Sequence, residues 1–113
     1  MSGPEPVWIA VCGVIEIPQR GSRVLKTDAG CVALFRTAKD DVFAARDHCP
    51  HKGGPLSQGI VHDRAVACPL HNMVFDLDTG LARGPDQYQV QTFPVKVEDG
   101  VVSVDMRALA EAR

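Results

Sequence analysis

The stretch Asp47–Gly80 constrains this chain more than any other, because it contains two short pairs of cysteine and histidine. One residue separates Cys49 from His51, and two residues separate Cys68 from His71. A proline follows the cysteine of each pair, at Pro50 and Pro69, and Gly53 and Gly54 follow the first pair, which is typical of a loop. Two such loops can converge on one metal centre, so we take the rest of the chain as the scaffold that holds them together.

The composition bounds the class of protein. The chain has 113 residues, enough for one domain, and its net charge of -2 comes without any basic run. That balance argues against a nucleic-acid or anionic membrane partner. The N-terminus has no signal-peptide pattern, and no apolar run approaches the roughly 20 residues that a membrane span needs. We therefore expect a cytoplasmic protein with no membrane contact, in which cysteines are ligands or buried thiols rather than disulfides.

The pattern of short apolar runs predicts an all-β fold. About nine runs rich in β-branched residues are separated by turn residues every eight to twelve positions, as in an antiparallel sandwich or small barrel. The expected strands are Val7–Val14, Arg23–Lys26, Cys31–Arg36, Val42–Arg46, Gly59–Val61, Ala65–Ala67, Val74–Leu77, Val95–Val97 and Val101–Val104. Only Met106–Glu111 has a helical pattern, and at that length it is marginal alone.

Three chemistries compete for the two Cys/His pairs. Catalysis by an activated thiolate is the weakest, because it needs one cysteine and one histidine with different roles. A structural zinc takes two thiolates and two imidazoles, but usually with both cysteines in one loop. Here each loop contributes one of each, which favours a [2Fe–2S] cluster in which two histidines replace two cysteines on one iron. Zinc stays open on this evidence.

The remaining cysteines and histidines have ordinary explanations. Cys12 and Cys31 lie in apolar segments, so we expect small buried side chains without a redox function. His48 precedes Cys49, and His62 lies in an expected hairpin turn. Solvent exposure is the expectation for both histidines.

Two segments of the sequence resemble the signature of the Rieske family. They are CPHKGGPLSQG and CPLHNMVFDLDTG, and the resemblance extends through VWIAVCGVIEIP and QVQTFPVKVEDGVV to nearly the whole chain. Within that family the segments HKGGPL, PLHNMVFDL and FPVKVEDG are most similar to the small subunit of assimilatory NAD(P)H nitrite reductase.

The resemblance implies a Rieske-type antiparallel β-sandwich at 7–105, with a small cluster-binding subdomain of two loops at about 47–80. A flexible tail at 1–6 would precede it, and a tail at 106–113, with the short helix, would follow it. The implied cofactor is one [2Fe–2S] cluster. Cys49 and Cys68 would bind its inner iron, and His51 and His71 its outer iron.

The resemblance also implies a function in electron transfer. The chain would be the small subunit of a nitrite reductase and thus a component of an oxidoreductase. We assign it no catalytic residue. Its partner would be a large subunit carrying FAD, sirohaem and a [4Fe–4S] cluster. Electrons would pass from NAD(P)H to nitrite, which is reduced to ammonia. The alternative is a free Rieske ferredoxin, which carries electrons from a flavin reductase to a ring-hydroxylating oxygenase. A zinc-stabilised binding module ranks third.

Four positions predict a low reduction potential. High-potential Rieske proteins join the two loops by a disulfide, and the matching positions here are Gly54 and Leu70. They also place serine and tyrosine hydroxyls near the cluster sulfurs, where this chain has Met73 and Phe75. Because hydrogen bonds to sulfur stabilise the reduced cluster, we expect a midpoint near the low end of the Rieske range, about -150 mV.

Overall fold

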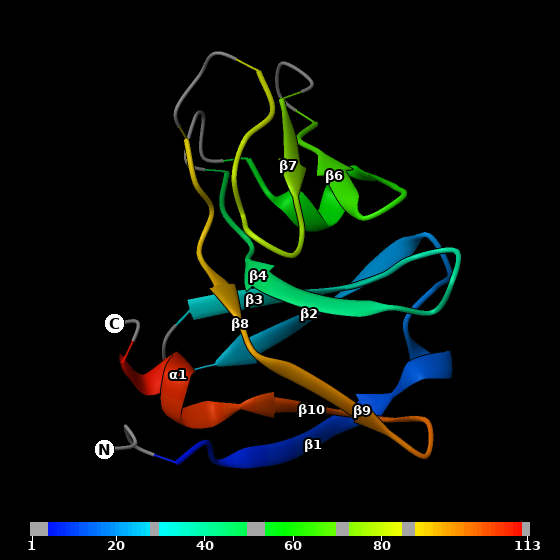
Figure 1. The fold of residues 1–113 in the computed structure, drawn as a ribbon, viewed down its shortest axis with the longest axis vertical. Helices are drawn as coiled ribbons and strands as arrows, with labels where there is room; N and C mark the ends of the chain where they lie inside the picture. The colour runs from blue at the N-terminus through cyan, green and yellow to red at the C-terminus, as the bar shows by residue number, and fades with distance from the viewer. Residues whose placement is uncertain (1–4, 28–29, 50–53, 70–72, 85–87, 112–113) are drawn as a thin grey trace.

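Three antiparallel sheets are stacked in layers in the computed structural model of the chain (Figure 1). The structure describes residues 5–27, 30–49, 54–69, 73–84 and 88–111. Sheet A orders its strands as β1 (Trp8–Gly13), β10 (Val101–Asp105) and β9 (Val95–Glu98). Sheet B has the order β2 (Gly21–Thr27), β3 (Gly30–Arg36), β4 (Val42–Arg46) and β8 (Thr92–Phe93). Sheet C consists of β5 (Ile60–His62), β6 (Ala65–Ala67) and β7 (Val74–Asp76). The all-β antiparallel prediction is confirmed.

Helical structure is confined to short segments in the described residues. Two 3₁₀ turns, η1 (Val14–Glu16) and η2 (Leu56–Gln58), connect strands, and α1 (Met106–Glu111) follows β10. In the part of the chain that the structure describes, no helix is long and apolar enough to cross a membrane.

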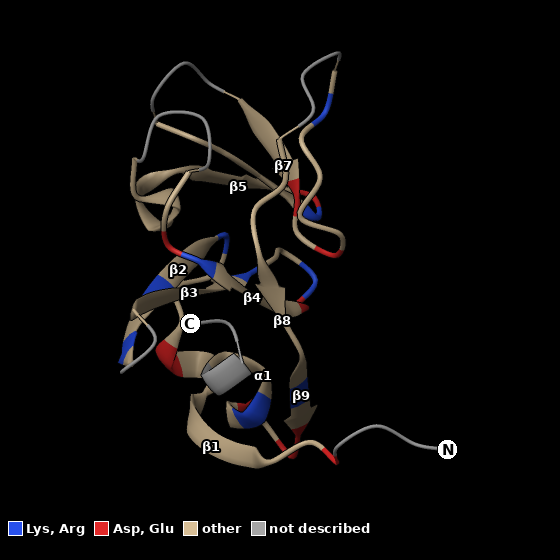
Figure 2. Ribbon diagram, turned by 90° about the vertical axis from the view of Figure 1, so that its left-hand side faces the viewer, with Lys and Arg blue, Asp and Glu red and all other residues tan. Residues whose placement is uncertain are grey.

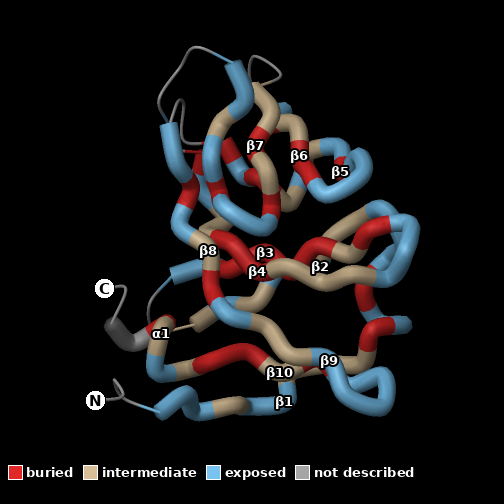
Figure 3. The backbone as a smooth tube through the Cα atoms, viewed as in Figure 1, coloured by how far each residue is buried: buried red, intermediate tan, exposed pale blue. Residues whose placement is uncertain are grey.

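Sheet B is the middle layer, and its strand β3 is buried on both faces. Val32 and Leu34 of β3 belong to the core shared with sheet A, while Ala33 and Phe35 belong to the core shared with sheet C. All four are at most 1% exposed, and Figure 3 shows the buried positions along β3 and β4. The continuous apolar run at these positions is the pattern of a strand covered on both sides. Figure 2, turned by 90°, shows the same order of layers.

One strand segment joins sheet B to sheet A. β8 pairs with β4 through Phe93 and Thr92, and β9 then pairs with β10 in the other sheet. Pro94 lies between the two segments and has no backbone N–H to continue a ladder. The chain therefore changes sheet at this proline.

Arg64, in the turn between β5 and β6, connects sheet C to sheet B. Its guanidinium lies 4.9 Å from the centre of the Phe43 ring, and its Nη1 is 3.4 Å from Oδ2 of Asp41. The Arg64 carbonyl accepts a hydrogen bond of 2.8 Å from the backbone N–H of Leu77. These contacts hold the far end of sheet C to the β3–β4 turn.

The return of the chain after β7 requires a glycine. Gly80 has a φ of +78°, and a Cβ added there would lie 2.1 Å from the carbonyl oxygen of Val90. Gly100 has nearly the same φ, +76°, but a Cβ there would meet nothing within 4 Å. Substitutions at these two glycines therefore separate the cost of the backbone conformation from the cost of a steric clash.

We expect Gly100→Ala to lower the free energy of unfolding by about 1–2 kcal/mol, the usual cost of a left-handed conformation. Gly80→Ala should lower it by about 4 kcal/mol, because a backbone clash adds to that cost. Urea unfolding of both variants measures the difference. Equal losses would show that the close approach of residues 80 and 90 contributes nothing.

Candidate metal centre

The two cysteines of the paired motif begin loops that are closed in the same way. Cys49 follows β4 and Cys68 follows β6. The backbone N–H of Cys49 donates to the carbonyl of Gly54 at 2.8 Å, and that of Cys68 donates to the carbonyl of Met73 at 2.7 Å. In both loops the bond joins the cysteine to the residue five positions later. The interiors of the loops, 50–53 and 70–72, lie outside the described residues, and with them the predicted ligands His51 and His71 and the position Leu70.

Both thiols are completely buried. Cys49 and Cys68 are 0% exposed and belong to the same core cluster, the one between sheets B and C. Neither is in a disulfide. Thiolates are soft ligands that suit iron–sulfur clusters and zinc. Two buried thiols, each in a loop closed by a backbone hydrogen bond to the residue five positions later, fit the two cysteine ligands of such a centre.

The core cluster that contains both thiols also involves Phe75 and Met73. Phe75 is 0% exposed in the same cluster, and Met73 packs against it as a partly buried side chain. Neither side chain has an O–H or N–H group that could donate to a cluster sulfur. Gly54 has no side chain with which to form a disulfide. The described surroundings therefore match the composition on which the low potential was predicted.

The structure describes only the cysteine half of the candidate centre. Among the described residues, no three His, Cys, Asp or Glu side chains are grouped closely enough to hold a metal ion. That is the result expected when two of four proposed ligands fall outside the described ranges. The ligand set Cys49, His51, Cys68 and His71 thus stays a prediction.

The cysteines outside the motif differ from one another. Cys12 is partly buried, as the sequence suggested, but Cys31 is exposed, so the expectation of burial was wrong there. Cross-strand pairing between β3 and β4 begins at Val32, and Cys31 lies one residue beyond it. The side chain is therefore past the edge of the covered sheet. His48 and His62 are exposed, as expected.

Thiol labelling should follow this order of burial. Desolvation raises the pKa of Cys12 above its usual value, and Glu16 adds to the rise while Arg23 opposes it. Since the thiolate is the reactive form, iodoacetamide should modify Cys31 first and Cys12 more slowly at neutral pH. Cys49 and Cys68 should react only after the cluster is removed. Mass spectrometry of timed samples measures all four, and early labelling of Cys49 in the cluster-bound protein would contradict its assignment as a ligand.

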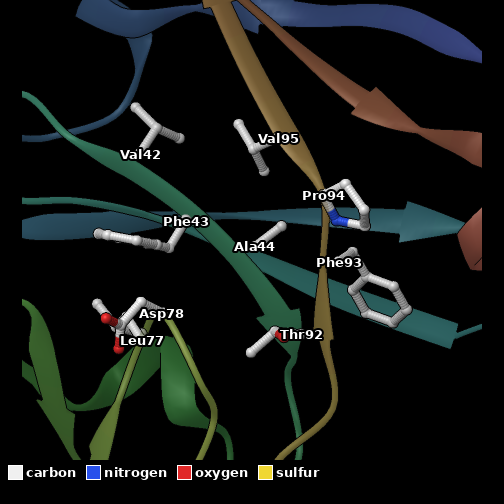
Figure 4. Close-up of a pocket in the computed structure, with 9 residues that line it drawn as sticks. All are labelled: Val42, Phe43, Ala44, Leu77, Asp78, Thr92, Phe93, Pro94 and Val95. Atoms are coloured by element: carbon white, nitrogen blue, oxygen red, sulfur yellow. The ribbon is translucent and has the colours of Figure 1, made fainter. Parts of the chain in front are cut away.

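One pocket among the described residues is separate from the candidate centre. It has a volume of about 390 Å³ and lies where the chain passes from β8 in sheet B to β9 in sheet A (Figure 4). Its lining contains neither cysteine nor histidine and comprises Val42, Phe43, Ala44, Leu77, Asp78, Thr92, Phe93, Pro94 and Val95. The pocket follows from the change of sheet at Pro94, because β8 pairs with β4 only at Ala44 and Ala45.

Sequence analysis did not single out a pair of polar residues that the structure places at the base of the first loop. The carboxylate of Asp47 accepts two hydrogen bonds from Ser57. The Ser57 backbone N–H donates to Oδ1 at 2.7 Å, and the Ser57 hydroxyl donates to Oδ2 at 2.8 Å. The two residues are ten positions apart, and no periodic pattern links them. Their closeness to Cys49 in the sequence was the available signal.

Comparison with known proteins identifies the family. The family described as the Rieske-like [2Fe-2S] domain matches residues 7–105. The 3-phenylpropionate/cinnamic acid dioxygenase ferredoxin subunit of Photorhabdus laumondii is 38% identical over 96 residues, which cover 83% of this chain and 90% of that protein. Other curated relatives are also ferredoxin components of dioxygenase systems.

Solved structures of two kinds have the same fold. A structure assigned as an NADH-dependent nitrite reductase small subunit from Mycobacterium tuberculosis has a TM-score of 0.79 and 29% identity, covering 89% of this chain and 96% of that one. The ferredoxin in a complex with the oxygenase of carbazole 1,9a-dioxygenase has a TM-score of 0.75 and 28% identity, covering 85% and 99%. With the family match over most of the chain, these likenesses show that the protein belongs to the Rieske-like [2Fe–2S] family, whose cofactor is a Rieske [2Fe–2S] cluster.

Proposed function

We propose that this chain is a Rieske ferredoxin that carries single electrons from a flavin reductase to a ring-hydroxylating oxygenase. The observation that carries the proposal is the 38% identity to a dioxygenase ferredoxin subunit over 90% of that protein's length. A second support is the likeness to a ferredoxin solved in complex with its oxygenase. The sequence alone ranked this function second, behind nitrite reduction. The curated relatives reverse that order.

In this proposal Cys49 and Cys68 bind the inner iron, and His51 and His71 bind the outer iron. The cluster supplies reversible one-electron transfer. Complete burial of both thiols supports the assignment of the cysteines to the inner side. A backbone hydrogen bond from each cysteine closes its loop. We assign no catalytic residue to this chain, which would act as a component of an oxidoreductase system.

A second candidate is the small subunit of an NAD(P)H nitrite reductase. It is supported by the TM-score of 0.79 with the Mycobacterium tuberculosis protein and by the segments HKGGPL and FPVKVEDG. The cluster and its ligands would be the same. Only the partner would differ: a large subunit with FAD, sirohaem and a [4Fe–4S] cluster.

The test compares the two partners directly. The tagged, cluster-loaded protein is used to capture partners from cells of its source grown on nitrate, and from cells grown on an aromatic carbon source. The proposal predicts capture of an iron-containing oxygenase or its flavin reductase from the second culture. Capture of a sirohaem flavoprotein from the nitrate culture, with no oxygenase from the other, would instead establish the nitrite reductase function. Cys68→Ser, which should lack the cluster, is the control for capture that depends on the holoprotein.

A further inference from the structure

The base of the first cysteine loop is held by a side chain rather than by sheet pairing alone. Asp47 follows the last residue of β4, and Ser57 lies in η2. One carboxylate oxygen of Asp47 accepts from the Ser57 backbone N–H at 2.7 Å, and the other accepts from the Ser57 hydroxyl at 2.8 Å. Hydrogen bonds to a charged acceptor are shorter and stronger than neutral ones. We call this pair of bonds the Asp47–Ser57 clasp.

The clasp is anchored to sheet B on both sides. The backbone N–H of Asp47 donates to the carbonyl of Cys31 at 3.0 Å, at the end of β3. The hydroxyl of Ser22 in β2 donates to the carbonyl of Ser57 at 2.7 Å. Each partner of the clasp is thus fixed to a different strand of the middle layer.

The clasp brackets the first loop in the sequence. Cys49 and Gly54, which are joined by a backbone hydrogen bond, lie between Asp47 and Ser57 along the chain. Leu56, next to Ser57, is 0% exposed in the core that contains both thiols. After η2, a Cβ at Gly59 would lie 2.2 Å from the Ala67 carbonyl, so the chain there is pressed against β6. A change at the clasp would therefore be transmitted to Cys49 on one side and to the packing beneath it on the other.

We propose that Asp47 is a positioning residue for the cluster: through Ser57 it holds the first loop closed and fixes Cys49 in the geometry that binds iron. The inference rests on the proposed cluster site. Asp47 acts through the loop and needs no contact with the metal. Removal of outer partners that bind a metal ligand directly typically changes metal affinity 10- to 100-fold, and that range sets the scale of the effect expected here.

The experiment measures cluster loss from the holoprotein in the presence of an iron chelator, followed by visible absorbance. Asp47→Ala, which removes both bonds, should speed the loss by about 10- to 100-fold. Asp47→Asn keeps the shape and one acceptor oxygen, and its amide can donate to the Ser57 hydroxyl. That conservative variant should therefore restore a rate within about threefold of the wild type. The electron paramagnetic resonance lines of the reduced cluster should broaden in Asp47→Ala only.

Two control variants separate positioning from charge and from general stability. Asp40→Asn removes a carboxylate that binds Arg36 in the β3–β4 turn, and should leave the rate unchanged. Val102→Ala weakens the core between sheets A and B, where Val102 is 0% exposed, without touching the clasp. It should lower the melting temperature of the cluster-free protein but leave cluster loss within about twofold of the wild type.

The outcomes distinguish the two proposals. If Asp47→Ala loses its cluster at the wild-type rate, the positioning function is wrong and the cluster assignment stands. If Asp47→Ala and Val102→Ala lose it equally fast at equal melting temperatures, Asp47 acts only through stability, and the inference also fails. A wild-type protein that binds no cluster at all would overturn the proposed function itself.

Discussion

Replacing Cys49 or Cys68 by serine should abolish cluster binding. Each cysteine would supply one of the two thiolates on the inner iron, and a serine hydroxyl remains protonated near neutral pH and binds iron poorly. The purified variants should be colourless and contain less than about a tenth of the roughly two irons per chain expected for a [2Fe–2S] cluster. Visible absorbance and iron analysis measure the result.

The matched controls are Cys12→Ser and Cys31→Ser. Both remove a thiol from the same protein, but Cys12 is only partly buried in β1 and Cys31 is exposed in β3. Full iron content is expected in both. A serine at 49 or 68 also buries a hydroxyl at a cost of about 1–3 kcal/mol, so the melting temperatures of the cluster-free variants must be compared. A brown, iron-loaded Cys68→Ser protein would disprove the ligand assignment.

The reduction potential should lie near -150 mV, at the low end of the Rieske range, because Met73 and Phe75 stand where high-potential Rieske proteins place hydroxyl donors. Protein-film voltammetry of the holoprotein measures it directly. A midpoint above about +100 mV would contradict the prediction. Such a low value suits a carrier that accepts electrons from a flavin and does not suit quinol oxidation.

A single hydroxyl should move this potential upward. Phe75 occupies the position at which high-potential Rieske proteins carry tyrosine, and it is 0% exposed in the same core cluster as the two thiols. A hydrogen bond to a charged group contributes about 1.5–3 kcal/mol, and 59 mV corresponds to a tenfold change for one electron. Phe75→Tyr should therefore raise the midpoint by an amount on the order of 60 mV. Phe93→Tyr adds the same hydroxyl in the other core, the one between sheets A and B, and should leave the midpoint unchanged.

Local patterns predicted the strands well. β4 and β6 begin and end at the expected residues. The hairpin of β9 and β10 also forms where Asp99 and Gly100 were expected to turn, and both residues have the positive φ that such a two-residue turn requires. These features depend on neighbours in the sequence, so the sequence contains the information for them.

Features that depend on distant contacts were less accessible. The apolar run of β3 indicates burial on two faces, but not that sheets A and C cover them. Cys31 precedes the buried run and is exposed, because the pairing of β3 with β4 begins only at Val32. In the candidate site, the motif singled out Cys49 and Cys68, which the structure buries in one core cluster. The Asp47–Ser57 clasp was missed because a hydrogen bond across a loop leaves no periodic signal.

The matching hydrogen bonds that close the two cysteine loops have a consequence for the rate of electron transfer. Cys49 and Cys68 are completely buried, and a backbone hydrogen bond closes each of their loops. Groups that are already oriented need not rearrange when charge appears beside them. With Cys49 and Cys68 as ligands, the cysteine side of the cluster would have a small reorganisation energy. The speed of electron exchange would then be set by the encounter with the partner and the difference in potential.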